Sequence, residues 1–222
     1  MPIAQPAQTR RTLGRHLGRS RGLRLVLSVA VVGAGFGAAG TPAHASSISW
    51  GTVLISGSQW AGGDAGLGDL NVYSNGTGNQ DRSGTFGRQY ECTELAMRWA
   101  HYKYGEPDIW PVSSAADMWN AGPSLPVPMA QEPNGGPVAP EHGDIIVFAA
   151  TQSDPTGHVA VVSSVTSSSV TFVQQNFTVN GTPSGSWTQP MSGTTVAAFA
   201  GLPVLGWLHA NQVLPPPHHR LP

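Results

Sequence analysis

The order of the sequence patterns constrains the fold of this chain most: a helix-like run comes first and strand-like segments follow. Residues 92–104 read CTELAMRWAHYKY, with apolar side chains near one helical face and Gly105 positioned to end the helix. Five later segments are rich in Val, Ile, Ala or Phe and resemble strands, at 144–150, 158–165, 169–176, 195–200 and 205–210. Helices followed by strands predict an α+β fold in which N-terminal helices pack on an antiparallel β-sheet.

Polar residues and prolines predict the structure of the segment between the first helix and the first strand. A short second helix is expected from Ser114 to Gly122, with Asp117 three residues after Ser114 in a capping-box-like spacing. Residues 123–142 contain six prolines and are expected to form an irregular loop within the same domain. On the first helix, the charged side chains are expected to face water: Glu94, Arg98 and Lys103.

The first 45 residues have the organisation of an export signal. Six arginines between Arg10 and Arg24 precede an uncharged apolar run, and Ala43-His44-Ala45 fits the pattern cut by a signal peptidase. The apolar run of about 16 residues is shorter than the roughly 20 that a membrane span needs. We therefore expect cleavage near Ala45, a secreted or cell-wall protein, and no membrane contact afterwards; Arg10-Arg11 leaves Sec and Tat export both open.

Cleavage would leave one acidic domain. Residues 46–222 carry five basic and twelve acidic side chains, a formal net charge of −7. Phosphate binding needs clustered Lys and Arg, so this charge argues against a nucleic-acid partner. The predicted organisation is a signal peptide at 1–45, an N-terminal extension at 46–69, a main domain at 70–210 and a disordered tail at 211–222.

Cys92 is the one cysteine in the sequence, so no internal disulfide is available. Its predicted place is the first turn of the helix, where free backbone N–H groups and the helix dipole favour a thiolate and offer donors to an oxyanion. His158 heads a strand-like segment, and a hairpin would bring it close to Gln174 and Asn176 at the end of the next strand. Either amide oxygen would be able to orient the imidazole, so Cys92, His158, Gln174 and Asn176 are the candidate catalytic residues.

These blocks resemble the CHAP family of cysteine, histidine-dependent amidohydrolases/peptidases. The matching features are Cys-Thr-Glu-Leu-Ala at 92–96, Gly-Asp-Ile at 143–145, Gly-His-Val-Ala-Val-Val at 157–162 and Gln-Gln-Asn at 174–176. The resemblance covers roughly residues 70–210. It implies a papain-like α+β fold and an enzyme that cleaves amide or peptide bonds in bacterial peptidoglycan or its peptide stems.

Residue by residue, the resemblance makes Cys92 the nucleophile and His158 the general base. The family position commonly held by glutamate matches Gln174, and the asparagine after it matches Asn176. An amide orients the imidazole without stabilising its positive charge, so a thiolate–imidazolium pair should be less favoured here. Some family members bind calcium through aspartates before the cysteine, but residues 81–91 offer only Asp81 and Glu91. We expect no metal, no cofactor and a monomer.

Two alternatives remain. An NlpC/P60-type endopeptidase shares the order of cysteine before histidine, although the Gly-His-Val-Ala block fits it less well. A non-catalytic secreted CHAP-like binding domain is consistent with Gln174 and with the acidic surface. The bond that an active enzyme would cleave, the muramoyl amide or a stem or cross-bridge peptide bond, is not specified by any motif.

Overall fold

The computed structural model describes residues 48–62, 67, 70–76 and 82–210. The predicted signal peptide and the predicted C-terminal tail lie outside these ranges, as does Asp81. In the part of the chain that is described, no helix is long and apolar enough to cross a membrane.

The main helix forms where its apolar spacing predicts it. Helix α2 runs from Cys92 to Tyr104 and buries Leu95 and Trp99. Gly105 follows in the left-handed conformation, with φ of 77°, and its N–H caps the helix, as glycine at this position commonly does. The other helical segments are short: α1 Gly57–Trp60, α3 Met118–Ala121 and the 3₁₀ helix η1 Gly122–Ser124.

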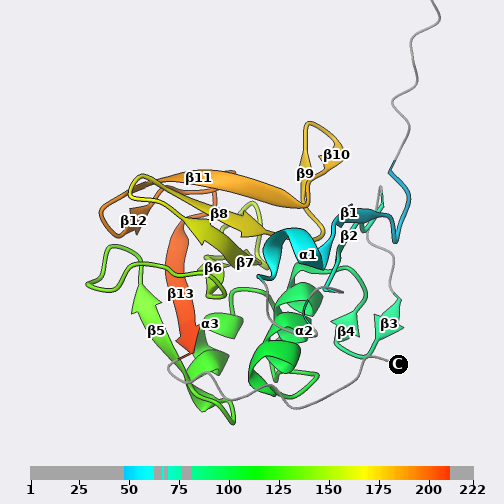
Figure 1. Ribbon diagram of the computed structural model, residues 1–222, viewed down its shortest axis with the longest axis horizontal. Helices are drawn as coiled ribbons and strands as arrows, with labels where there is room; N and C mark the ends of the chain where they lie inside the picture. The colour runs from blue at the N-terminus through cyan, green and yellow to red at the C-terminus, as the bar shows by residue number, and fades with distance from the viewer. Residues whose placement is uncertain (1–47, 63–66, 68–69, 77–81, 211–222) are drawn as a thin grey trace, which may run out of the picture. The chain divides into compact units, whose positions relative to one another are not determined.

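A seven-stranded antiparallel sheet forms the other layer (Figure 1). Its spatial order is β12-β11-β8-β7-β6-β13-β5. In chain order the strands are β5 Met129–Pro133, β6 Ile145–Phe148, β7 His158–Val165, β8 Ser169–Val173, β11 Ser186–Ser192, β12 Thr195–Val196 and β13 Val204–Ala210. Helix α2 packs on this sheet, chiefly against β7, so the predicted α+β class is confirmed.

Both faces of the central strands are buried. Val147, Val159 and Val161 share a core with α2, while Phe148, Ala160 and Val162 lie in a second core on the opposite face. Successive side chains of a strand point to opposite faces, so burial on both faces explains the nearly continuous apolar runs.

Three small antiparallel pairs complete the fold: β1 Val53–Ile55 with β2 Val72–Tyr73, β3 Ser83–Gly84 with β4 Gly87–Arg88, and β9 Thr178–Val179 with β10 Thr182–Pro183. The described part of the predicted N-terminal extension takes part in the same core. Its Trp60 ring lies 5.1 Å from the Trp99 ring, and the Trp60 indole N–H donates to the Leu70 carbonyl at 2.9 Å.

Strand β5 lies within the proline-rich segment that was expected to be irregular. It pairs on one side only, with β13, and a sheet edge tolerates Pro133. Asn134 follows and joins this edge to the opposite one, because its side chain donates to the Val196 carbonyl at 3.0 Å and accepts from the Val196 N–H at 2.8 Å. The second core is therefore enclosed by a sheet whose two edges meet.

Substitution of Gly206 tests the bulge in β13, where the pairing with β6 shifts register. Gly206 has φ of +153°, and an added Cβ would collide with the Glu132 carbonyl oxygen and come within 2.8 Å of Trp119. We expect Gly206→Ala to lower the free energy of unfolding by about 3 kcal/mol or more, measured by urea denaturation.

Gly201→Ala is the matched control, because Gly201 also has positive φ, +84°, but no atom within 4 Å of the added Cβ. Its expected cost is about 1 kcal/mol. Equal losses in the two variants would contradict the steric account.

Candidate active site

Cys92 occupies the first position of helix α2, after the extended residue Glu91. The backbone N–H groups of Val159, Thr93 and Cys92 are oriented so that they favour negative charge on its sulfur. Cys92 as a whole residue is half-buried. Val159 is the second residue of β7, so the sulfur lies near the start of this strand, and the preceding residue carries the imidazole.

His158 is the first residue of β7 and pairs with Phe148 of β6. The imidazole is buried, and its Nε2 lies 3.0 Å from Oε1 of Gln174. Because an amide oxygen only accepts, Nε2 carries the hydrogen in this bond and Nδ1 keeps a free lone pair. The rings of Phe177 and Phe199 flank the imidazole, with centroids at 5.3 and 6.2 Å.

The turn before His158 requires glycine at position 157. Gly157 has φ of +64°, and an added Cβ would lie 2.5 Å from the Phe148 carbonyl oxygen and 3.0 Å from the Ala150 nitrogen. The neighbouring Thr156 carbonyl accepts the Ala116 N–H at 3.0 Å. The loop that leads into His158 is therefore held by β6 and by the segment before α3.

The structure separates the two amides that the sequence offered as partners of the imidazole. Gln174 contacts His158, whereas the Asn176 amide donates to Oε2 of Glu91 at 2.6 Å. Strand β8 ends at Val173, and Asn176 has φ of 52°, so the strand alternation that placed both amides on one face does not reach Asn176.

Burial controls the charge state of the two central groups. Burial, with a smaller contribution from the Glu91 carboxylate, raises the pKa of the Cys92 thiol to about 12 even though three N–H groups oppose the shift. Burial also lowers the pKa of the His158 imidazole to about 4, although the hydrogen bond that the imidazole donates to Gln174 opposes the shift. The helix terminus was expected to favour a thiolate, but near neutral pH both groups are uncharged in this structure.

This arrangement suits general-base activation of a thiol. No hydrogen bond joins the Cys92 sulfur to the imidazole, although both residues belong to the described part of the chain. Contacts of this kind often tighten only when substrate binds. The N–H groups around the sulfur are the available donors for an oxyanion.

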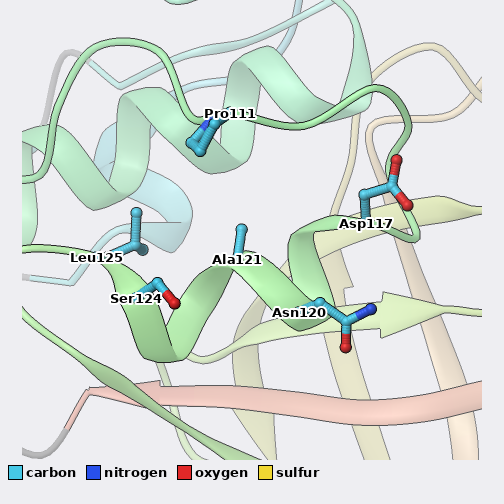
Figure 2. Close-up of a pocket in the computed structure, with 6 residues that line it drawn as sticks. All are labelled: Pro111, Asp117, Asn120, Ala121, Ser124 and Leu125. Carbon is cyan, nitrogen blue, oxygen red and sulfur yellow. The ribbon is translucent and has the colours of Figure 1, made fainter.

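A separate hollow of about 340 Å³ lies between the loop at Pro111 and the α3–η1 segment (Figure 2). Its walls are formed by Pro111, Asp117, Asn120, Ala121, Ser124 and Leu125. Neither Cys92 nor His158 contributes to it, so this hollow is distinct from the candidate catalytic residues. Among the described residues, no three His, Cys, Asp or Glu side chains gather closely enough to bind a metal ion.

A thiol at a helix N-terminus, an imidazole on the adjoining strand and an amide bound to that imidazole are the groups that papain-like cysteine hydrolases use. The comparison with protein families agrees: residues 81–176 match the family described as CHAP domain. Residues 81–176 thus correspond to a CHAP domain.

Two curated proteins are distantly similar to this chain. They are the bifunctional glutathionylspermidine synthetase/amidases of Escherichia coli (strain K12) and Shigella flexneri, each 26% identical over 136 residues. Each match covers 55% of this chain but only 22% of the relative, so the chain spans about a fifth of the length of these proteins.

A solved structure, titled the crystal structure of Ly7917, also matches. It is 20% identical, with a TM-score of 0.36, over 55% of this chain and 54% of the other.

The charge state of Cys92 is testable through Glu91, whose carboxylate raises the thiol pKa. Iodoacetamide should alkylate the wild-type thiol at a rate that still increases between pH 9 and pH 10.5, because the thiolate is the reactive form. We expect Glu91→Gln to move this rise to lower pH and to speed alkylation at pH 8 several-fold.

Glu132→Gln, on β5, removes a carboxylate at the edge of the sheet and should leave the profile unchanged. A wild-type rate that reaches its plateau near neutral pH would contradict the neutral thiol.

Proposed function

We propose that this protein is a secreted cysteine hydrolase that cleaves amide or peptide bonds of bacterial peptidoglycan through an acyl-enzyme on Cys92. The observation that carries the proposal is the place of the thiol. Cys92 opens α2, and the backbone N–H of Val159 favours negative charge on its sulfur. Val159 follows His158, whose Nε2 is bound by Gln174. The CHAP domain match and the amidase relatives support the reaction class.

The first half of the reaction forms a thioester. His158 Nδ1 takes the proton from the Cys92 thiol as the sulfur attacks the carbonyl carbon of the substrate. The N–H groups near the sulfur stabilise the oxyanion. The imidazolium then gives its proton to the leaving amine, and the C–N bond breaks.

The second half releases the acid. His158 Nδ1 takes a proton from water while the oxygen attacks the thioester, and the imidazolium returns that proton to the sulfur as the C–S bond breaks. The products are an amine and a carboxylic acid, with the thiol and neutral imidazole restored. Gln174 keeps Nδ1 toward the thiol in both halves by binding the Nε2 hydrogen.

Peptidoglycan is the proposed substrate because residues 1–45 have the pattern of a signal peptide and because the CHAP resemblance implies a wall enzyme. The remaining domain has a formal charge of −7 and no basic cluster, which argues against a nucleic-acid substrate. An anionic wall would have to be bound by specific contacts and not by overall charge. The wall offers two kinds of bond for this chemistry, the N-acetylmuramoyl-L-alanine amide and the peptide bonds of the stem and cross-bridge.

A small amide conjugate is the second candidate substrate. The relatives from Escherichia coli and Shigella flexneri are named as glutathionylspermidine synthetase/amidases and align over 55% of this chain. An amide between a peptide and a polyamine requires the same nucleophile and general base. Glutathionylspermidine is therefore included in the assay as an alternative substrate.

Digestion of purified sacculi by residues 46–222, followed by mass spectrometry, tests the proposal. A muramoyl amidase would release stem peptides with a free N-terminal alanine, whereas an endopeptidase would leave peptide on muramic acid. Cys92→Ala and His158→Ala should each lower turnover by about three orders of magnitude or more, because nucleophile and base act as a unit.

Wild-type protein that leaves both sacculi and glutathionylspermidine intact would contradict the hydrolase proposal. In that case the folded domain, checked by circular dichroism, would fit the alternative of a non-catalytic binding module.

A further inference from the structure

Three consecutive amide side chains after β8 reach three different parts of the site. Gln174 binds the imidazole of His158, Gln175 turns toward α2, and Asn176 binds the Glu91 carboxylate. Gln174 and Gln175 are both fully buried. This segment is therefore the place where the surroundings of the base and of the nucleophile connect.

Gln175 uses its whole side-chain amide in this connection. Its Nε2 donates to Glu94 Oε2 at 2.7 Å and to the Glu91 carbonyl at 3.2 Å. Its Oε1 accepts from the Arg98 guanidinium at 3.1 Å and from the Tyr73 N–H at 2.9 Å. Four hydrogen bonds satisfy both donors and both lone pairs of a glutamine.

The partners on α2 belong to the turn that carries the nucleophile. Glu91 is the N-cap, and its carbonyl also accepts the Leu95 N–H at 3.3 Å. Glu94 and Arg98 form a buried ion pair with a separation of 2.8 Å. Because these charged groups are buried, any loss of their hydrogen-bond partners is costly, which makes the amide of Gln175 hard to replace.

We propose that Gln175 is a positioning residue that fixes the first turn of α2, and with it Cys92, against the strand end that carries Gln174 and thus orients His158. This inference rests on the proposed hydrolase function. None of the four hydrogen bonds of the Gln175 amide goes to the sulfur or the imidazole. It acts through Glu94 and the Glu91 carbonyl on one side, and through the neighbouring Gln174 on the other.

Exchanging the side chains at positions 94 and 175 tests the proposal more sharply than substituting either residue alone. Gln175→Glu keeps the size and the acceptor but sets a carboxylate against Glu94 and removes both donors. Adding Glu94→Gln restores a donor–acceptor pair with the direction reversed and leaves Arg98 a carboxylate to bind. The matched control is Gln189→Glu, which changes a buried glutamine of β11 that binds Trp187 and Ala198.

We expect Gln175→Glu to lower kcat on the order of 10-fold to 100-fold with KM within about twofold, since small displacements of a nucleophile have effects of this size. In Gln175→Glu, the backbone N–H of Leu95 should exchange with solvent faster than in the wild type, measured by hydrogen-exchange NMR. This N–H donates to the Glu91 carbonyl and so closes the first turn of α2. The double variant restores the contact between positions 94 and 175 but not the donor to the Glu91 carbonyl. It should therefore recover part of the lost kcat and partly slow Leu95 exchange. Gln189→Glu should change neither quantity.

Unchanged kcat and Leu95 exchange in Gln175→Glu, equal effects in Gln189→Glu, or no recovery in the double variant would each overturn the proposal. Hydrogen exchange needs no substrate. If the wild-type protein hydrolyses nothing, the proposed function fails while Leu95 exchange still decides whether Gln175 holds the turn.

Discussion

The hydrogen bonds made by Gln174, Gln175 and Asn176 hold the site together, because they connect groups that lie far apart in sequence. The imidazole of His158 and the N-terminal turn of α2 belong to different layers of the fold. One short segment binds the imidazole at 3.0 Å and Glu94 of the helix at 2.7 Å. The relative position of thiol and imidazole therefore depends on a few buried amide contacts, and not on a disulfide or a metal ion bound by the described residues.

Burial gives this site a resting state without charges. The Cys92 pKa of about 12 and the His158 pKa of about 4 leave a thiol and a neutral imidazole near neutral pH. With Gln174 in place of a carboxylate, no negative group lies directly behind the imidazole to stabilise its positive form. The buried Nε2 of Gln174 has no hydrogen-bond partner among the described residues. In the proposed reaction, this resting state means that proton transfer accompanies attack on the substrate.

Local patterns were enough to predict α2 with its end at Gly105, and His158 at the head of a strand, because periodicity and turn residues act over short distances. Strands β5 and β11 were missed because they are polar and contain prolines. Glu94 and Arg98 were expected in water but are buried, since Gln175, their partner from about 80 positions away, satisfies them. Neither Glu91 nor Gln175 was predicted to shape the site. The available signal for Gln175 was the alternation of side chains in β8, which ends at Val173. Continued for two residues beyond that end, it points Gln174 and Gln175 in opposite directions.

The central claim, that a neutral imidazole held by Gln174 presents Nδ1 to the thiol, is tested most directly by NMR of protein with ¹⁵N-labelled histidine between pH 3 and pH 9. The account predicts that His158 carries its hydrogen on Nε2 and titrates near pH 4, and that Gln174→Glu moves this titration to higher pH. A hydrogen on Nδ1, or an imidazolium that persists at neutral pH, would contradict it.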